Sequence, residues 1–368
     1  MLKKYISFIA VFAIIIFIFP VTATAEQYDY GTTELYDAVP EEAKDFLDEN
    51  GIGADGSGIT GLTLERVIEA IKEEFRISVN RPMTMFSSLL AVILLTALLG
   101  NLGNSSDSSL KKVFSFVSSL ASTIIISSNL GTALEGISSA VSAASDFSLT
   151  YIPVIAGVIA VGGHVSTAAV YSSLMMIAVQ ILTQITVNIL LPVTSCLIGI
   201  SAAGGLDGEL KIDKMGDGLK KAIIWILGLI MTIFIGFLTL QSNITAAADS
   251  VSLRAARFAV STSVPFVGGS VSDALSTMKT SIELLKSGIG SFGVLTGCCV
   301  LFPVLISALC HRFFLFLAGL ISDILGTEDA GRMIRCGENV ISIVISMIIC
   351  FILFITVSSA LMLLICRQ

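Results

Sequence analysis

The sequence has few charged residues for its length. Asp, Glu, Lys and Arg make up 13% of its 368 residues, about half the share that is usual in soluble domains. Apolar residues make up 54%, and the mean hydropathy is +0.92. The range 147–206 contains no Asp, Glu, Lys or Arg at all. This composition disfavours a soluble enzyme and predicts a membrane protein.

Residues that carry chemistry are also scarce. The two histidines lie far apart and all seven cysteines follow residue 195, so their spacing indicates neither a metal site nor a disulfide framework. The metalloprotease, nucleophile-elbow and Walker motifs are missing. No basic stripe is present that would hold nucleic acid. We therefore expect no catalytic residues, no cofactor, no metal and no nucleic-acid partner.

The N-terminus has the pattern of a cleaved signal peptide. Lys3 and Lys4 precede an apolar run, 5–19, and Ala23-Thr24-Ala25 supplies small residues at the spacing that a signal peptidase accepts. We expect cleavage before Glu26, which places the next segment outside the cytoplasm. An uncleaved anchor helix is the alternative.

The segment 26–83 is acidic, with 14 of the 28 acidic residues against five basic ones. Its clearest pattern is a set of apolar residues on one face of a helix: Leu64, Val67, Ile68, Ile71 and Phe75. We expect an amphipathic helix that lies on the rest of the protein or on the bilayer surface. A docking site for another extracytoplasmic protein is the alternative.

The remainder of the chain predicts an all-α polytopic membrane helix bundle. The apolar stretches are 85–102, 113–130, 150–163, 166–190, 192–204, 222–241, 288–309, 313–325 and 340–366. Some are too short to span, so we expect six to eight crossings, with half-length or re-entrant pieces in 147–206. Prolines lack a backbone donor, so we expect helix starts or kinks at them. These helix breaks are Pro153, Pro192, Pro265 and Pro303.

Similar features recur about 110 residues apart and predict an internal repeat. The matching features are Lys111-Lys112 and Lys220-Lys221, Pro153 and Pro265, Pro192 and Pro303, and the pairs Gly162-Gly163 and Gly268-Gly269. The predicted division is a signal peptide (1–25), the acidic extracytoplasmic segment (26–83), a first span and loop (84–110), repeat unit 1 (111–206), a charged linker (207–219), repeat unit 2 (220–325) and a loop with the last span (326–368).

Charged residues in the second unit are candidates for a polar path. Lys279 and Glu283 stand four residues apart on one helix face, and Asp273 lies further back. Intramembrane charges usually pair with a partner or line a wet path. The alternative is an amphipathic helix at the membrane surface.

The stretch 253–274, L-R-A-A-R-F-A-V-S-T-S-V-P-F-V-G-G-S-V-S-D-A, resembles the signature region of the stage III sporulation protein AE family. Y-I-P-V-I-A-G at 151–157 adds to the resemblance. The residues that match the signature are Arg254, Arg257, Phe258, Pro265, Gly268, Gly269 and Asp273.

This resemblance implies a multi-pass protein of the mother-cell membrane around the forespore. The implied role is that of a subunit in a channel or secretion-like complex that sustains the forespore and its late gene expression. The implied partners are ring-forming membrane proteins, a secretion-type ATPase and small membrane proteins. Two alternatives stay open: a stand-alone secondary transporter, with Asp273, Lys279 and Glu283 in its coupling site, and a scaffold that conducts nothing.

Overall fold

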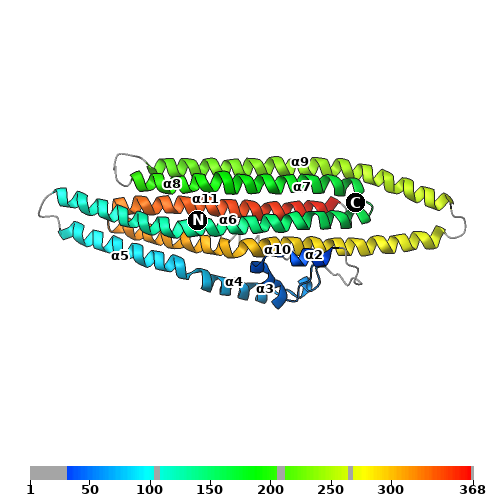
Figure 1. Ribbon diagram of the computed structural model, residues 1–368, viewed down its shortest axis with the longest axis horizontal. Coiled ribbons are helices and arrows are strands. Elements are labelled where there is room, and N and C mark those ends of the chain that lie inside the picture. The colour runs from blue at the N-terminus through cyan, green and yellow to red at the C-terminus, as the bar shows by residue number, and fades with distance from the viewer. Residues whose placement is uncertain (1–30, 103–107, 205–211, 264–267, 366–368) are drawn as a thin grey trace.

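The computed structural model describes residues 31–102, 108–204, 212–263 and 268–365. Every regular element in these ranges is helical, which confirms the all-α prediction. Long helices lie side by side along one axis of an elongated bundle (Figure 1). They are α5 (Asn80–Leu102), α6 (Ser108–Val161), α7 (Val165–Ile185), α8 (Leu191–Gly204), α9 (Ile212–Ser263), α10 (Gly268–Ile324) and α11 (Glu328–Ile365). The predicted signal peptide, 1–25, lies outside the described residues.

Three of the helices are much longer than a bilayer is thick. Helices α6, α9 and α10 contain 54, 52 and 57 residues. At a rise of 1.5 Å per residue each is about 80 Å long, whereas the hydrocarbon core measures about 30 Å. Apolar stretches that the sequence presents separately, such as 113–130 and 150–163, therefore belong to one continuous helix. The half-length or re-entrant pieces expected in 147–206 do not occur, because α6 continues to Val161 and α7 and α8 follow.

The prolines interrupt the hydrogen-bond ladder without ending a helix. Pro153 lies inside α6 and Pro303 inside α10, and each helix continues on both sides. Pro192 is the second residue of α8 and follows a π-helical turn, η3 (Thr186–Leu190), which joins α7 to α8. A proline gives no N–H to the carbonyl four residues before it, so a local change of register at this point is expected. Pro265 lies outside the described residues.

Six helical segments in the described part of the chain are long and apolar enough to cross a membrane. They are Asn80–Leu99, Phe116–Val161, Val165–Ile200, Gly216–Gln241, Ser287–Ile324 and Glu328–Leu361. The most apolar 18-residue window is 78% buried in the segment from α11 but only 22% buried in those from α5 and α9. Helix α11 packs against α6, α9 and α10. Its apolar side chains are therefore covered by protein. Most side chains in the windows of α5 and α9 are not buried, although Leu89 and Leu227 are.

The two ends of the bundle differ in composition. Helices α6 and α9 both begin at the end where α10 connects to α11 (Figure 1). We call this the lysine end, because Lys111 and Lys112 lie at the start of α6, and Lys220 and Lys221 lie in the third turn of α9. At the opposite end, Gly163 forms the turn between α6 and α7 with a φ of 92°, a conformation that favours glycine. The outer parts of α9 and α10 extend beyond this turn (Figure 1).

The acidic segment packs on the side of the bundle instead of forming one isolated helix. It contains α2 (Thr32–Asp37), α3 (Glu41–Glu49), a short 3-10 turn, η1 (Ile59–Gly61), and α4 (Leu64–Ser78). Leu35, Leu47 and Ile52 are at most 2% exposed and join the main core. The sequence pattern predicted only α4, because α2 and α3 are short and their apolar residues are few.

Glycines let this segment approach α10 closely. A Cβ atom on Gly288 would overlap the carbonyl of Asp55, and one on Gly56 would overlap the backbone of Gly288. The ring of Tyr36 stacks on Phe292 with centroids 6.2 Å apart. The acidic segment is therefore seated on α10 by direct backbone contact.

Candidate functional site

A group of charged and polar side chains lies between three helices near the lysine end. We call it the charged cluster, and its members are Asp217, Lys220, Arg312, Glu338 and Asn339. Lys220 Nζ donates to Asn339 Oδ1 at 3.2 Å, and Asn339 Nδ2 donates to Asp217 Oδ1 at 3.0 Å. Asn339 is only 8% exposed. The Asn339 amide therefore bridges an ammonium group and a carboxylate that both belong to α9.

Two further charges of the cluster come from the other helices. Glu338 on α11 interacts electrostatically with Arg312 on α10 and with Lys220 on α9. Arg312, Lys220 and Glu338 are all half-buried, and all lie in segments that are long and apolar enough to cross a membrane. Charges in such segments usually pair with each other or face a water-filled path. The cluster could thus line a polar path through the membrane or hold the three helices together through its charge interactions.

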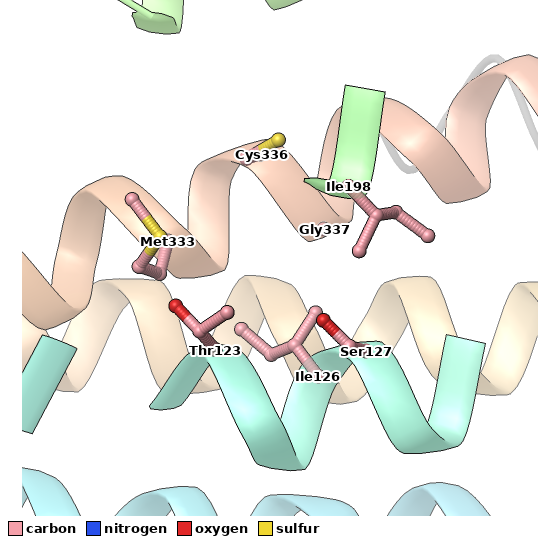
Figure 2. Close-up of a pocket in the computed structure, with 7 residues that line it drawn as sticks. All are labelled: Thr123, Ile126, Ser127, Ile198, Met333, Cys336 and Gly337. Carbon is pink, nitrogen blue, oxygen red and sulfur yellow. The ribbon is translucent and has the colours of Figure 1, made fainter. Parts of the chain in front are cut away.

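A small void lies one residue away from Glu338. Thr123 and Ser127 of α6 face Met333, Cys336 and Gly337 of α11, and Ile198 of α8 closes the side (Figure 2). The void measures about 10 Å³, which is close to the space that one water molecule needs. The helices beside the charged cluster are therefore closely packed in this conformation.

A second polar contact joins α9 to α7 beyond the charged cluster. The two carboxylate oxygens of Asp249 accept hydrogen bonds from the backbone N–H groups of Ser166, at 3.0 Å, and Thr167, at 2.9 Å. Burial raises the pKa of Asp249, but the hydrogen bonds from Thr167 and Ser166 outweigh it, so the pKa lies below its usual 3.8. Asp249 supplies the capping oxygens that the first turn of α7 needs.

An apolar cavity separates the acidic segment from α10. We call it the α4 cavity, and it encloses about 140 Å³. Val67 and Ile71 of α4 line one wall, while Cys299, Phe302 and Pro303 of α10 line the other. Glu42 and Glu74 also border the cavity.

The residues that the sequence predicted as a site fall in a different region. The sequence prediction placed the polar path at Asp273, Lys279 and Glu283, which belong to the outer part of α10, before its apolar portion begins at Ser287. Of the signature residues, Arg254, Arg257 and Phe258 belong to the last turns of α9, and Gly268, Gly269 and Asp273 to the first turns of α10. Pro265 lies outside the described residues, and so do the side chains of the others.

Sequence reasoning missed the charged cluster and Asp249. It used Lys220 only as part of the lysine pair that marks repeat unit 2, and it gave no role to Arg312, although Arg312 separates two apolar stretches. The sequence signal that could have identified the cluster was the isolated charge of Arg312 between two apolar stretches. The partners of each charge were not predictable, because Lys220 and Asn339 lie 119 residues apart. Among the described residues, no group of three or more His, Cys, Asp or Glu side chains is arranged to hold a metal ion.

Comparison with known proteins identifies relatives of this chain. The family described as stage III sporulation protein AE matches residues 54–365. A protein of Bacillus subtilis (strain 168) named "Stage III sporulation protein AE" is 24% identical over 230 residues, which cover 62% of this chain and 57% of that protein. The match thus spans less than two thirds of the relative's length. No solved structure matches.

Proposed function

Because the chain belongs to the stage III sporulation protein AE family, we propose that it is a membrane-embedded subunit of a channel or secretion-like complex linking mother cell and forespore. In this proposal it resides in the mother-cell membrane around the forespore, where it sustains the forespore and its late gene expression. Its partners are ring-forming membrane proteins, a secretion-type ATPase and small membrane proteins. The charged cluster carries the proposal, because a charged group shared by three apolar helices is typical of a transport path.

The length of α5 and its exposed apolar residues support a bilayer around the part of the bundle nearest the lysine end. The first apolar segment, Asn80–Leu99, contains 20 residues and is as long as one crossing. Its outer surface presents Leu94, Leu95 and Leu98, and the first half of α9 presents Trp225 and Ile233. The lysine end then faces the cytoplasm by the positive-inside rule. The acidic segment and the outer parts of α9 and α10 face the opposite side.

This placement gives the proposed path two polar ends. The charged cluster lies toward the cytoplasmic end, where an ATPase would act. Asp273, Lys279 and Glu283 lie toward the extracytoplasmic end, where ring-forming proteins would bind. Because the helices are closely packed near Glu338, opening the path requires α6 and α11 to separate.

The helix order also supports parallel repeat units. Helices α6 and α9 begin at the same end, and each is followed by a return, through α7–α8 or through α10. Pro192 lies in the first return and Pro303 in the second. Two crossings separate the two lysine pairs, so the units have the same orientation in the membrane.

Neutralising two members of the charged cluster tests the proposal. We expect Lys220→Met and Glu338→Gln each to lower the number of heat-resistant spores and late forespore gene expression about tenfold or more, while the protein stays in the membrane. Glu328→Gln is the matched control, because Glu328 is exposed in the first turn of α11. Normal sporulation of both cluster variants would contradict a path and favour the scaffold.

A secondary transporter working alone is the second candidate, and the charges of the outer α10 favour it. In that case the purified chain in proteoliposomes transports an ion-coupled solute, and neutral substitutions at Asp273, Lys279 or Glu283 stop the transport. The complex instead requires partners, so the chain alone transports nothing.

A further inference from the structure

Helix α4 is amphipathic, yet no residue of it is buried. Leu64, Ile68 and Phe75 are 49%, 40% and 52% exposed. Large exposed apolar side chains on a charged helix mark an interaction surface. The first apolar segment begins only at Asn80, so α4 precedes it in the chain.

Opposite α10, Val67, Ala70 and Ile71 of α4 instead line the α4 cavity. Its volume of about 140 Å³ is close to that of an apolar cavity that holds benzene. One large aliphatic or aromatic side chain therefore fits between Ile71 and Phe302. Pro303 provides no backbone N–H, which leaves the Cys299 carbonyl beside the cavity without its helical donor.

The charge around the α4 cavity determines which kind of ligand binds there most tightly. Glu42 and Glu74 border the cavity, and Ser78 Oγ donates to Glu74 Oε1 at 2.7 Å. Neither carboxylate forms an ion pair with a described Lys or Arg. The surrounding range 26–83 carries 14 acidic residues against five basic ones. An apolar group that enters here meets a negative rim, so a basic neighbour favours its binding and an acidic one opposes it.

We infer that the α4 cavity is the docking site for a basic amphipathic helix of an extracytoplasmic partner protein, which inserts one large apolar side chain between α4 and α10. The exposed residues Leu64 and Ile68 extend the apolar contact along α4, as a helix partner requires. Anionic lipid headgroups are disfavoured by the two carboxylates. The inference rests on the proposed function, because it uses the placement of α4 outside the bilayer.

Alkylation of Cys299 provides a direct measure of occupancy. The full-length protein, with its other six cysteines replaced by serine or alanine, is placed in nanodiscs of phosphatidylglycerol and phosphatidylcholine and treated with a fluorescent maleimide. The probe is a 16-residue synthetic amphipathic helix with lysines on its polar face and one central phenylalanine. A second peptide has glutamate in place of lysine. We expect the lysine peptide to slow alkylation about fivefold or more and the glutamate peptide to have no effect.

Two variants link the protection to the cavity. Ile71→Trp fills the space and should abolish protection. The double variant Glu42→Gln and Glu74→Gln should raise the peptide concentration needed for half protection about tenfold. Glu65→Gln with Glu69→Gln is the matched control, because both residues are exposed on α4 and do not line the cavity. Fluorescence anisotropy of labelled lysine peptide on the protein with all its cysteines repeats the comparison.

Three results would overturn the inference. Equal protection by both peptides would remove the charge argument, and protection that survives Ile71→Trp would place the peptide elsewhere. Slow alkylation without peptide in nanodiscs that contain phosphatidylethanolamine would identify a lipid as the occupant. Peptide binding does not depend on conduction, so normal sporulation of both Lys220→Met and Glu338→Gln would contradict the proposed function while leaving this inference intact.

Discussion

Asp249 on α9 accepts a hydrogen bond from the backbone N–H of Thr167, 82 residues earlier in the chain, in the first turn of α7. The same carboxylate accepts from Ser166. This contact fixes the start of α7 against α9, next to the glycine turn that ends α6. It also lies where α9 begins to extend beyond the rest of the bundle (Figure 1).

Removing the carboxylate should therefore destabilise this part of the bundle. Asp249→Ala leaves the N–H groups of Ser166 and of the buried Thr167 without their carboxylate acceptor, which costs about 1–3 kcal/mol of unfolding free energy. Thermal unfolding of the purified protein in detergent measures the loss as a lower Tm. Asp146→Ala, at an exposed position of α6, is the control and should leave Tm unchanged. Equal effects of the two substitutions would exclude a capping role.

The lowered pKa of Asp249 predicts how this stabilisation depends on pH. The carboxylate holds its proton less tightly in the folded chain, so its contribution is complete above the usual pKa of 3.8 and is lost as pH falls through the lower folded value. We expect the Tm difference between the wild type and Asp249→Asn to stay constant from about pH 7 to pH 5 and to shrink below about pH 4. If the Tm difference already shrinks between about pH 7 and pH 5, a group other than Asp249 causes the pH dependence.

The contact between Gly56 and Gly288 predicts that the acidic segment can be detached selectively. Gly288→Ala introduces a methyl group where the carbonyl of Asp55 already lies, so docking should weaken by about 1–3 kcal/mol. Limited trypsin digestion should then cleave faster at Lys44 and Arg66.

Gly136→Ala is the matched control, because nothing lies within 4 Å of a Cβ atom at that position. It should leave trypsin cleavage unchanged and stabilise α6 slightly, since alanine favours a helix over glycine. Resistance of Gly288→Ala to trypsin would show that the segment docks through other contacts.

The helix order predicts which surface positions share a side of the membrane. Lys221 and Glu328 lie at the lysine end and Val165 at the opposite end, and all three are exposed. In a protein without other cysteines, Lys221→Cys and Glu328→Cys should react with a membrane-impermeant maleimide only from the cytoplasm. Val165→Cys should react only from the other side. Labelling of Lys221→Cys and Glu328→Cys from opposite sides would contradict the two crossings between them.

Local sequence patterns were sufficient to predict the apolar helices and α4 but not the lengths of the apolar helices. Hydropathy identified apolar material at 288–309 and 313–325. These stretches form one helix, in which Arg312 between them interacts electrostatically with Glu338 of α11. Periodicity identified α4 from its own residues. It could not identify α2 or α3, whose few apolar side chains are buried only because α6 and α10 lie beside them.

The close packing of α10 was also predictable from the sequence only in part. The four-residue spacing of Gly293 and Gly297 is visible in the sequence and is typical of close helix contact. Their neighbours are not visible there: a Cβ atom on Gly293 would overlap the ring of Tyr151, and one on Gly297 would lie 2.9 Å from Ile355.

The sequence by itself determined the membrane character, the all-helical class, the family resemblance and the acidic N-terminal segment, because each depends on composition or on neighbours along one helix. Only the tertiary structure decided that Lys220, Glu338 and Arg312 form one cluster and that Asp249 caps α7. The α4 cavity likewise required the folded chain. Each of these sites joins residues far apart in sequence, and the packing of entire helices determines which of their faces meet.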